Sequence, residues 1–404
     1  MLLRHLSLVN FRLYARLEID FPEGIVVLRG ANAQGKTSLL EAIYYLATGQ
    51  AYHASSDRQL IHFLALHTEP LPFALIVAET EDARHERWRL ECRLIQETPA
   101  PGEQRLRKEV LINGARKRRG DLVGRLTVVL FLPQDLRLVE GSPADRRRYL
   151  DLVLSQVDSE YATTLAEYNR ALSQRNALLK LLQNGNSADI AQLDFWDELV
   201  CRQGAQILAR RSTALAELET LATPIHRTLT GGADSLRLAY HPAFTVPAAD
   251  ESQLELPLST PVGRLDLPAA EIEAALRRQL QRTRAEEISR GVTLVGPHRD
   301  EVRWLANGID LGIYGSRGQA RTAVLALKLA EVAWLRARLG EWPLLLLDEV
   351  LAELDGQRRQ DLLTRLGDAA QCILTTSDVN LFPAEFINHA TIWEVKEGQI
   401  LGCS

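Results

Sequence analysis

Eight residues near the start of the chain have the composition of a phosphate-binding loop. Residues 30–37 read GANAQGKT and match the pattern GxxxxGK[ST] at every position. The glycines let the backbone curl so that its N–H groups face phosphate oxygens, and the positive end of a following helix adds to this attraction. We expect Lys36 to reach the β- and γ-phosphates of ATP and Thr37 to ligate Mg²⁺. The expected nucleotide contacts are Gly30, Ala31, Asn32, Ala33, Gln34, Gly35, Lys36, Thr37 and Ser38.

A second segment, PLLLLDE at residues 343–349, has the pattern of a buried parallel strand that ends in two carboxylates. An acid at the carboxyl end of such a strand lies beside the phosphate loop. We expect Asp348 to hold Mg²⁺, directly or through water, and Glu349 to orient or deprotonate the attacking water. On its own the segment is equally well explained as a strand end with two solvated acids. Together with the loop, it predicts ATP hydrolysis.

A third segment, YGSRGQ at residues 314–319, stands directly before a predicted helix. The Ser316 hydroxyl and the backbone N–H groups at Gly318 and Gln319 would form a second anion site at the helix N-terminus. One nucleotide has one γ-phosphate, which Lys36 and Mg²⁺ already hold. The second site therefore favours ATP sandwiched between two subunits, although a simple helix cap explains the four residues SRGQ in isolation.

Short apolar or alternating runs predict that residues 1–130 are rich in strands. These runs are LSLVNF, LEIDF, GIVVLRG, FALIVAET and WRLECRLI, and one helix is expected at about 38–47. The phosphate loop then has a strand before it and a helix after it, which is the context that supports the motif. With these flanks, a glycine-rich turn that binds nothing is the weaker interpretation.

The middle of the chain has the spacing of helices. Ser142, Pro143 and Asp145 supply an N-cap, a first-turn proline and a first-turn acid, and a helix is expected to run to about Leu182. A turn at 183–187 and a second helical pattern through Leu218 predict an antiparallel hairpin. A proline-rich stretch at about 241–267 and a charged helix at 269–289 follow.

Strand patterns return from Gly291 as VTLVGP, EVRWLA, PLLLLDEV and CILTTS, with helices expected at about 319–339 and 357–366. The simplest fold class is α/β, with one P-loop ATPase lobe formed by both chain ends and an inserted, mostly α-helical second lobe. The predicted boundaries are 1–132 and 291–404 for the ATPase lobe and 133–290 for the insertion.

Composition sets the outer limits of function. The 404 residues carry a net charge of -5, which excludes a uniformly basic nucleic-acid coat. The four cysteines form no CxxC pair, so neither a zinc ribbon nor a disulfide framework is expected. No uncharged apolar run reaches the length that crosses a bilayer, and the start lacks the apolar core of a secretory signal. These features predict a soluble, cytoplasmic protein without a membrane partner.

Local basic density nevertheless offers a candidate DNA surface. The cluster consists of Arg105, Arg107 and Lys108 before a predicted hairpin at Asn113-Gly114, and Arg116, Lys117, Arg118 and Arg119 after it. Such residues suit phosphate contacts, which carry affinity but little sequence choice. A solvated face that binds nothing has equal weight. Residues 146–148, three further arginines, are weaker candidates because their helix start could pack against the ATPase lobe.

The order of these motifs resembles that of ABC-type ATPases. There, SxGQ before the acidic strand is the signature that caps ATP of the other subunit, and ELD at 353–355 falls at the D-loop, which implies a nucleotide contact for Asp355. Within that class the chain is similar to the RecF family of the SMC and Rad50-like branch. The segments that carry the similarity are LSLVNFRLY at 6–14, FLPQDLRLVEGSPADRRRYLD at 131–151 and TLVGPHRDEV at 293–302.

The resemblance implies further site residues. Gln134 falls at the Q-loop, which links Mg²⁺ to the junction of the lobes, although a polar turn residue also explains it. The usual switch histidine is absent from CILTTSD, and Thr375, Thr376 or Ser377 is expected to replace it. His53 and Ser56 stand where relatives carry arginines, and Arg58 remains.

The resemblance also implies a function. Two chains would close over two ATP molecules around gapped or junction DNA, and slow hydrolysis would reopen them. RecO and RecR would be the partners in placing RecA on single strands during recombinational repair and replication restart. A transporter's nucleotide-binding subunit is the main alternative, disfavoured by about 280 residues between phosphate loop and signature. A nuclease-linked relative would need a further acidic cluster, which the sequence does not display.

Overall fold

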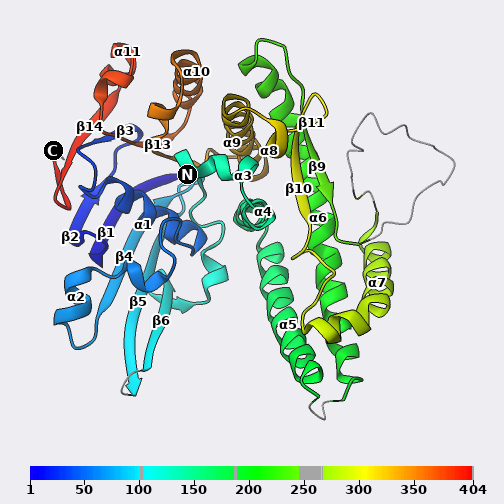
Figure 1. Cartoon of the computed structure of the whole chain (residues 1–404). Helices are drawn as coiled ribbons and strands as arrows, with labels where there is room; N and C mark the ends of the chain where they lie inside the picture. Colours follow the sequence, from blue (N-terminus) through cyan, green and yellow to red (C-terminus); the bar gives the residue numbers. More distant parts are fainter. Residues whose placement is uncertain (101–102, 186–188, 245–264, 266, 403–404) are drawn as a thin grey trace. The chain divides into compact units, whose positions relative to one another are not determined.

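The computed structural model describes residues 1–100, 103–185, 189–244, 265 and 267–402. They form two compact units, one of residues 1–134 with 335–404 and one of residues 135–334 (Figure 1). The two ends of the chain thus share one unit, as the sequence predicts.

A mostly parallel sheet in the first unit carries the motifs. Its strand order is β15-β14-β3-β13-β12-β8, and only the β14–β15 pair is antiparallel. The strands are β3 (Gly24–Arg29), β8 (Val128–Phe131), β12 (Leu344–Asp348), β13 (Gln371–Thr376), β14 (Ala390–Lys396) and β15 (Gln399–Leu401). Every residue of β12 and β13 is buried, which explains why their sequences are continuous rather than alternating apolar runs. The carboxyl ends of β3, β12 and β13 therefore meet at one edge.

An antiparallel sheet completes the first unit. Its order is β2-β1-β4-β5-β6-β7, with β1 (Leu2–Phe11), β2 (Tyr14–Asp20), β4 (Phe73–Glu81), β5 (Arg87–Ala100), β6 (Glu103–Ile112) and β7 (Ala115–Lys117). The predicted hairpin turn is confirmed, with Asn113 at φ 50° and Gly114 at φ 77°.

One apolar core joins both sheets to helix α1 (Lys36–Thr48), through residues such as Leu8, Leu39 and Leu346. Gln371 reinforces this junction from a fully buried position, because its side chain accepts from Leu3 N at 2.7 Å and donates to Leu3 O at 3.0 Å. The remaining helices of this unit are α2 (Phe63–Thr68), α10 (Gly356–Leu366) and α11 (Ala384–Asn388).

The second unit is mostly helical, with a small sheet β11-β10-β9. Its elements are α3 (Arg137–Glu140), α4 (Pro143–Val157), α5 (Ser159–Gln183), α6 (Gln192–Leu229), β9 (Leu236–His241), α7 (Ala269–Arg290), β10 (Glu301–Ala306), β11 (Ile309–Asp310), α8 (Leu311–Tyr314) and α9 (Arg317–Leu339), whose last residues belong to the first unit. The predicted cap at Ser142 is confirmed, since its side chain accepts from Asp145 N.

Three sequence predictions for this region need correction. The helix expected to reach Leu182 is two helices, because Asp158 leaves the helical conformation and caps α5 by accepting from Tyr161 N at 2.8 Å. The expected strand VTLVGP is irregular, with bends at several positions and no strand pairing. The second unit extends to residue 334 instead of 290. The residues after 290 belong to it because β10 pairs with β9, and because the fully buried Asp300 accepts from Tyr240 Oη at 2.6 Å. The proline-rich stretch at 241–267 lies mostly outside the described residues.

Among the described residues, no helix combines the length and the apolar character needed to cross a membrane.

Candidate nucleotide-binding site

The phosphate loop connects β3 to α1. Its tight path needs left-handed backbone at Ala33 (φ 63°) and Gly35 (φ 118°), and the second value is accessible only to glycine at low cost. The Lys36 side chain is only 4% exposed, and its Nζ donates to Gly30 O at 2.7 Å and Ala31 O at 3.0 Å. The ammonium group is therefore held within the loop.

The acids at the end of β12 lie against this loop. Asp348 Oδ1 accepts from Thr37 Oγ1 at 3.0 Å, and Glu349 Oε1 lies 3.0 Å from Lys36 Nζ. Glu349 is also left-handed (φ 53°), an uncommon conformation for a residue with a β-carbon that is often found at functional sites. The structure thus brings together the lysine, hydroxyl and two carboxylates that the sequence assigned to ATP chemistry.

The three candidates for the missing switch histidine have different surroundings. Thr375 donates through Oγ1 to Asp348 Oδ1 at 2.8 Å and accepts from Glu349 N at 2.9 Å. Ser377 Oγ lies 3.2 Å from Glu349 Oε2, and Ser377 N lies 3.3 Å from the same oxygen. Thr376 instead donates to Asp378 O at 2.8 Å. Only Thr375 and Ser377 therefore contact the acidic pair.

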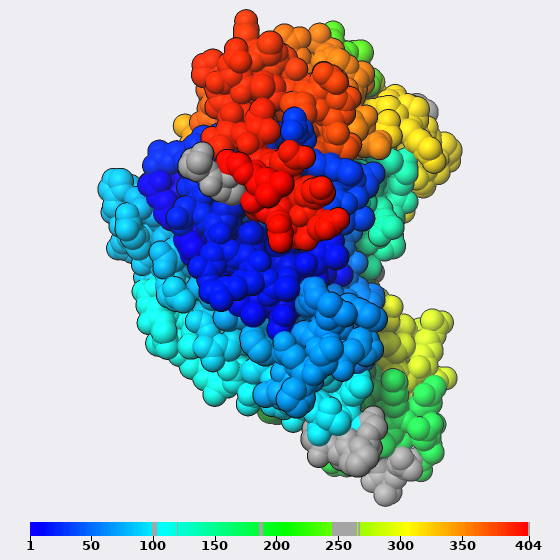
Figure 2. Space-filling model, turned by 90° about the vertical axis from the view of Figure 1, so that its left-hand side faces the viewer, coloured from blue at the N-terminus to red at the C-terminus, as the bar shows by residue number. Residues whose placement is uncertain are grey.

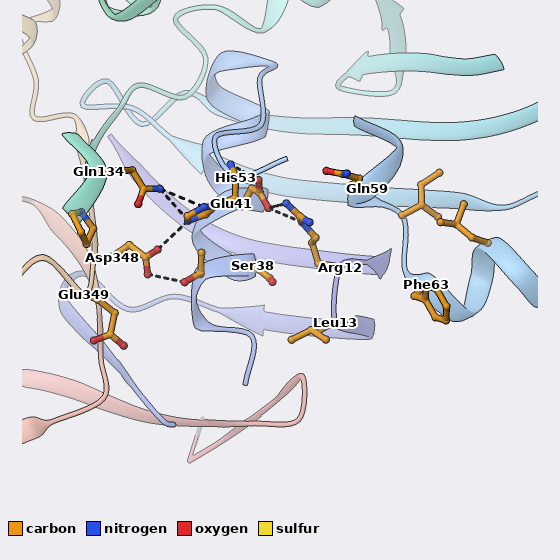
Figure 3. Close-up of a pocket in the computed structure, with 14 residues that line it drawn as sticks. Arg12, Leu13, Ser38, Glu41, His53, Gln59, Phe63, Gln134, Asp348 and Glu349 are labelled. Carbon is orange, nitrogen blue, oxygen red and sulfur yellow. Dashed lines mark hydrogen bonds and ion pairs between the residues drawn. The ribbon is translucent and has the colours of Figure 1, made fainter. Parts of the chain in front are cut away.

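Gln134 and His53 lie beside Asp348 (Figure 3). Gln134 Nε2 is 3.3 Å from His53 Nδ1, and His53 Nε2 is 3.7 Å from Asp348 Oδ2. The expected Q-loop residue thus contacts His53, one of the two positions at which the resemblance led us to expect an arginine. Both line a cavity of about 640 Å³, together with Arg12, Leu13, Thr37, Ser38, Glu41, Gln59, Ile61, Phe63, Leu66, Pro133, Asp348 and Glu349.

Sequence reasoning missed an ion pair that supports this cavity. Glu41 on α1 is 1% exposed, and its carboxylate accepts from Arg12 Nε at 2.7 Å and from His53 N at 3.1 Å. Tyr52 donates its hydroxyl proton to Thr37 O at 3.1 Å, and burial raises its pKa well above the ordinary value, so it remains a donor. No local pattern marks these partners, because their contacts depend on the tertiary fold.

In the second unit, the signature residues form a reciprocal cap on α9. Ser316 N donates to Gln319 Oε1 at 3.0 Å, and Gln319 N donates to Ser316 Oγ at 3.3 Å. Both residues are exposed, as is Gly318. A β-carbon at Gly318 would meet nothing closer than Ser316 Oγ at 3.9 Å, so the described chain itself does not require glycine there.

Asp355, the expected D-loop contact, caps α10 by accepting from Arg358 N at 3.0 Å. This hydrogen bond, ahead of the charge of Arg358, lowers the pKa of the Asp355 carboxyl.

The basic cluster divides into paired and unpaired side chains. The paired ones are Arg107 with Glu97, Lys108 with Asp57, and Arg116 with Glu109. Arg105, Lys117 and Arg118 are exposed, and no ion pair within the described part of the chain joins them to a carboxylate. The side chain of Arg119 lies outside what is described. Arg116, Lys117 and Arg118 line a depression of about 580 Å³ with Asp121.

Two of the three weaker DNA candidates, Arg146 and Arg147, have structural roles instead. Arg146 is buried and donates to Glu301 Oε1 at 2.9 Å and Gly141 O at 2.9 Å, and Arg147 donates to Asp300 O at 2.6 Å. These arginines hold the segment that leads into β10, so they are poor candidates for DNA contacts.

The donor set suits Mg²⁺ held largely by a nucleotide. Among the residues that the structure describes, no group of three or more His, Cys, Asp or Glu side chains is placed to bind a metal. The Thr37 hydroxyl and the Asp348 carboxylate meet instead beside the loop. Mg²⁺ in phosphate-transfer sites characteristically takes few protein ligands and completes its shell with phosphates and water.

A phosphate loop after β3, acids after β12 of the same parallel sheet, with β13 between these two strands, and a helical insertion in the sequence between the two motifs define the class of ABC-type ATPase folds. The family model described as RecF/RecN/SMC N terminal domain matches residues 2–393. The chain is 40% identical over 413 residues to the DNA replication and repair protein RecF of Roseiflexus castenholzii, and 41% identical over 411 residues to that of Chloroflexus aurantiacus, with 99% of each chain covered. The chain belongs to the RecF family.

Solved structures agree. The chain is similar to the recombination mediator protein RecF-ATP in the RecFOR pathway, with a TM-score of 0.82, 28% identity and coverage of 98% of this chain and 96% of that one. It is also similar to an SMC head bound to the C-winged helix domain of ScpA, with a TM-score of 0.50 and 18% identity over 99% of this chain and 96% of that one, which concerns the fold alone. The predicted family and fold class are confirmed, and the transporter interpretation is not supported.

Proposed function

We propose that the chain binds ATP at residues 30–38 and hydrolyses it slowly in a cycle of DNA binding and dimerisation. The observation that carries this proposal is a pair of contacts at the phosphate loop, Thr37 with Asp348 and Lys36 with Glu349, each at 3.0 Å. The similarity to a RecF-ATP structure supports the choice of nucleotide. Thr37, Asp348 and Gln134 would hold Mg²⁺, which would neutralise charge on the phosphates when bound.

Each polar group then has a task. Lys36 balances the charge of the phosphates, and Glu349 accepts a proton from the attacking water. Two contacts position that carboxylate. Ser377 Oγ lies against Glu349 Oε2, and the backbone N–H of Glu349 donates to Thr375 Oγ1. Gln134 connects the site to residue 135, where the second unit begins, and so suits a role in reporting nucleotide state.

Dimerisation is proposed because the exposed Ser316 and Gly318 offer hydrogen-bond donors to an anion outside their own chain. Asp355 would contribute to the same composite site. The described chain gives no steric reason for glycine at 318, and the close approach of a second subunit's ATP would supply one. Two ATP molecules would thus be sandwiched between two copies of the chain.

Sedimentation of wild type and Ser316→Arg, with and without ATP and a gapped duplex, tests this composite site. Wild type is expected to dimerise with ATP and to bind the duplex more tightly. The variant is expected to retain ATP binding as a monomer and to dimerise about tenfold or more weakly, because a bulky cation would occupy the contact surface. Equal loss of ATP binding and dimerisation would contradict a role in the other subunit's site, and monomeric wild type under all conditions would contradict the proposed cycle.

The partner DNA is proposed to contact the exposed part of the basic cluster. Replacing Lys117 and Arg118 together by alanine is expected to weaken binding to any duplex sequence and to reduce the salt-dependence slope by about 2, one for each lost phosphate contact. Titration of labelled duplex at several salt concentrations measures both effects. Arg16→Ala is the matched control, since Arg16 is exposed on β2 and paired with Glu18. An unchanged slope would remove this hairpin from the DNA surface.

The biological setting is proposed from the relatives, which are named DNA replication and repair proteins, and from the RecFOR pathway named for the solved structures. The chain would act in the cytoplasm at gapped or junction DNA and help RecO and RecR to load RecA. A RecA-loading assay on gapped DNA with and without the chain checks this role directly.

A further inference from the structure

The C-terminal hairpin of the first unit reaches the middle of the phosphate loop. Strand β14 runs parallel to β3, with Glu394 opposite Arg29, and the turn to β15 continues past the end of β3. At that turn, Glu397 N donates to Gln34 Oε1 at 2.7 Å and Gly398 N donates to Gln34 O at 3.0 Å. Figure 2 shows these last strands, in red, lying on the N-terminal part of the chain, in blue.

Two glycines allow this close approach. A β-carbon at Gly30, the first loop residue, would lie 2.4 Å from Val395 O on β14. Gly398 is left-handed (φ 70°), and its β-carbon would lie 2.6 Å from Leu13 O. Both obstacles are backbone atoms, which cannot move aside as a flexible side chain can. The hairpin therefore fits closely against the phosphate loop at Gly30 and against the β1–β2 turn at Leu13.

The hydrogen bonds fix the direction of the loop's donors. In a planar trans peptide the C=O and the following N–H point to opposite sides. The bond from Gly398 N to Gln34 O therefore orients the N–H of Gly35 away from the hairpin. Tyr14 donates its hydroxyl proton to Gly35 O at 3.1 Å and orients the N–H of Lys36 in the same way. Donors that are already oriented bind an anion without first losing conformational freedom.

We propose that the β14–β15 turn is a positioning element of the phosphate site, with Gln34 and Gly398 as positioning residues that act through the loop backbone. This inference rests on the proposed ATP site. It assigns to the C-terminal hairpin, about 360 residues away in the sequence, a share of the affinity for the triphosphate. The hairpin itself contacts the loop from outside and needs no contact with the nucleotide.

The test compares Gly398→Ala and Gln34→Met with a matched control, Gly114→Ala. Gly114 occupies the same position of a similar tight turn in the same unit (φ 77°), but a β-carbon there meets nothing within 4 Å. ATP and inorganic tripolyphosphate, each with Mg²⁺ and without DNA, are titrated into the full-length chain, and thermal unfolding is recorded. Loss of one or two positioning hydrogen bonds should weaken both ligands about five- to tenfold in Gly398→Ala and Gln34→Met, with Gly114→Ala binding as wild type.

Tripolyphosphate distinguishes the loop from contacts to the base or ribose, because it occupies only the phosphate site. If Gly398→Ala and Gln34→Met unfold at lower temperature but bind both ligands as wild type does, the turn is merely structural and the inference is overturned. If only ATP binding weakens, the loop geometry is intact and the inference also fails. Wild type that binds neither ligand would overturn the proposed ATP site as well, so the two failures are distinguishable.

Discussion

Replacing Glu349 by glutamine is expected to lower the rate of ATP hydrolysis by about 100-fold or more, the usual contribution of a general base. Glutamine keeps the length and an oxygen that can accept from Ser377, but it cannot take a proton from water. ATP binding should persist, because the loop and Lys36 remain in place. Single-turnover hydrolysis and ATP titration measure the two effects separately, and sedimentation should show dimers that persist after ATP is added.

Glu18→Gln is a suitable control, since Glu18 is exposed on β2 and pairs with Arg16 rather than with the cavity. Its hydrolysis rate should equal that of wild type. If Glu349→Gln hydrolyses ATP at an unchanged rate, the base must be another group, and the contacts between Glu349, Lys36 and Ser377 would have only a structural role.

Replacing Lys36 by alanine is expected to lower ATP affinity by at least about 100-fold, because charge-assisted hydrogen bonds to phosphate are lost in a buried place. The loss also leaves the carbonyls of Gly30 and Ala31 and the carboxylate of Glu349 without the cation that they contact. These oxygens would then repel the phosphates. Calorimetric titration with ATP measures the affinity, and ATP-dependent dimerisation should disappear with it.

Lys180→Ala provides the comparison for this second prediction, because Lys180 is an exposed lysine on α5 in the other unit. It should bind ATP as wild type does. Persistence of both ATP binding and dimerisation in Lys36→Ala would exclude residues 30–38 as the phosphate site.

The centre of the site could be predicted from the sequence because each of its two motifs lies within a short segment of the chain. The loop motif consists of glycines, a lysine and a hydroxyl residue at fixed spacing. The second motif, a buried strand that ends in acids, is also a pattern of neighbouring residues. The fold then had only to bring the two segments together, and contacts of Thr37 with Asp348 and of Lys36 with Glu349 show that it does.

The supporting residues could not be predicted in the same way. Arg12, Glu41 and His53 meet through tertiary structure, as do Gln34 and the turn at 397–398, and no spacing in the sequence marks them. The helix break at Asp158 was obscured for another reason. Apolar residues continue at helical spacing across it, whereas the competing cap depends on one side chain.

The signature is an intermediate case. Its residues suit both a helix cap and an anion site, and a single chain displays the cap. The second role would require ATP that is held by another copy of the chain.

The strand order of the parallel sheet also has a consequence for biosynthesis. Strand β3 pairs with β13 and β14, so the phosphate loop leaves the ribosome long before its neighbouring strands exist. At about 5–20 residues per second, Asp348 follows Lys36 by about 15 to 60 s. During that interval ATP cannot stabilise the nascent chain, and the apolar face of β3 and α1 lacks its cover. The early N-terminal half therefore exposes apolar surface that favours aggregation until the last strands are made.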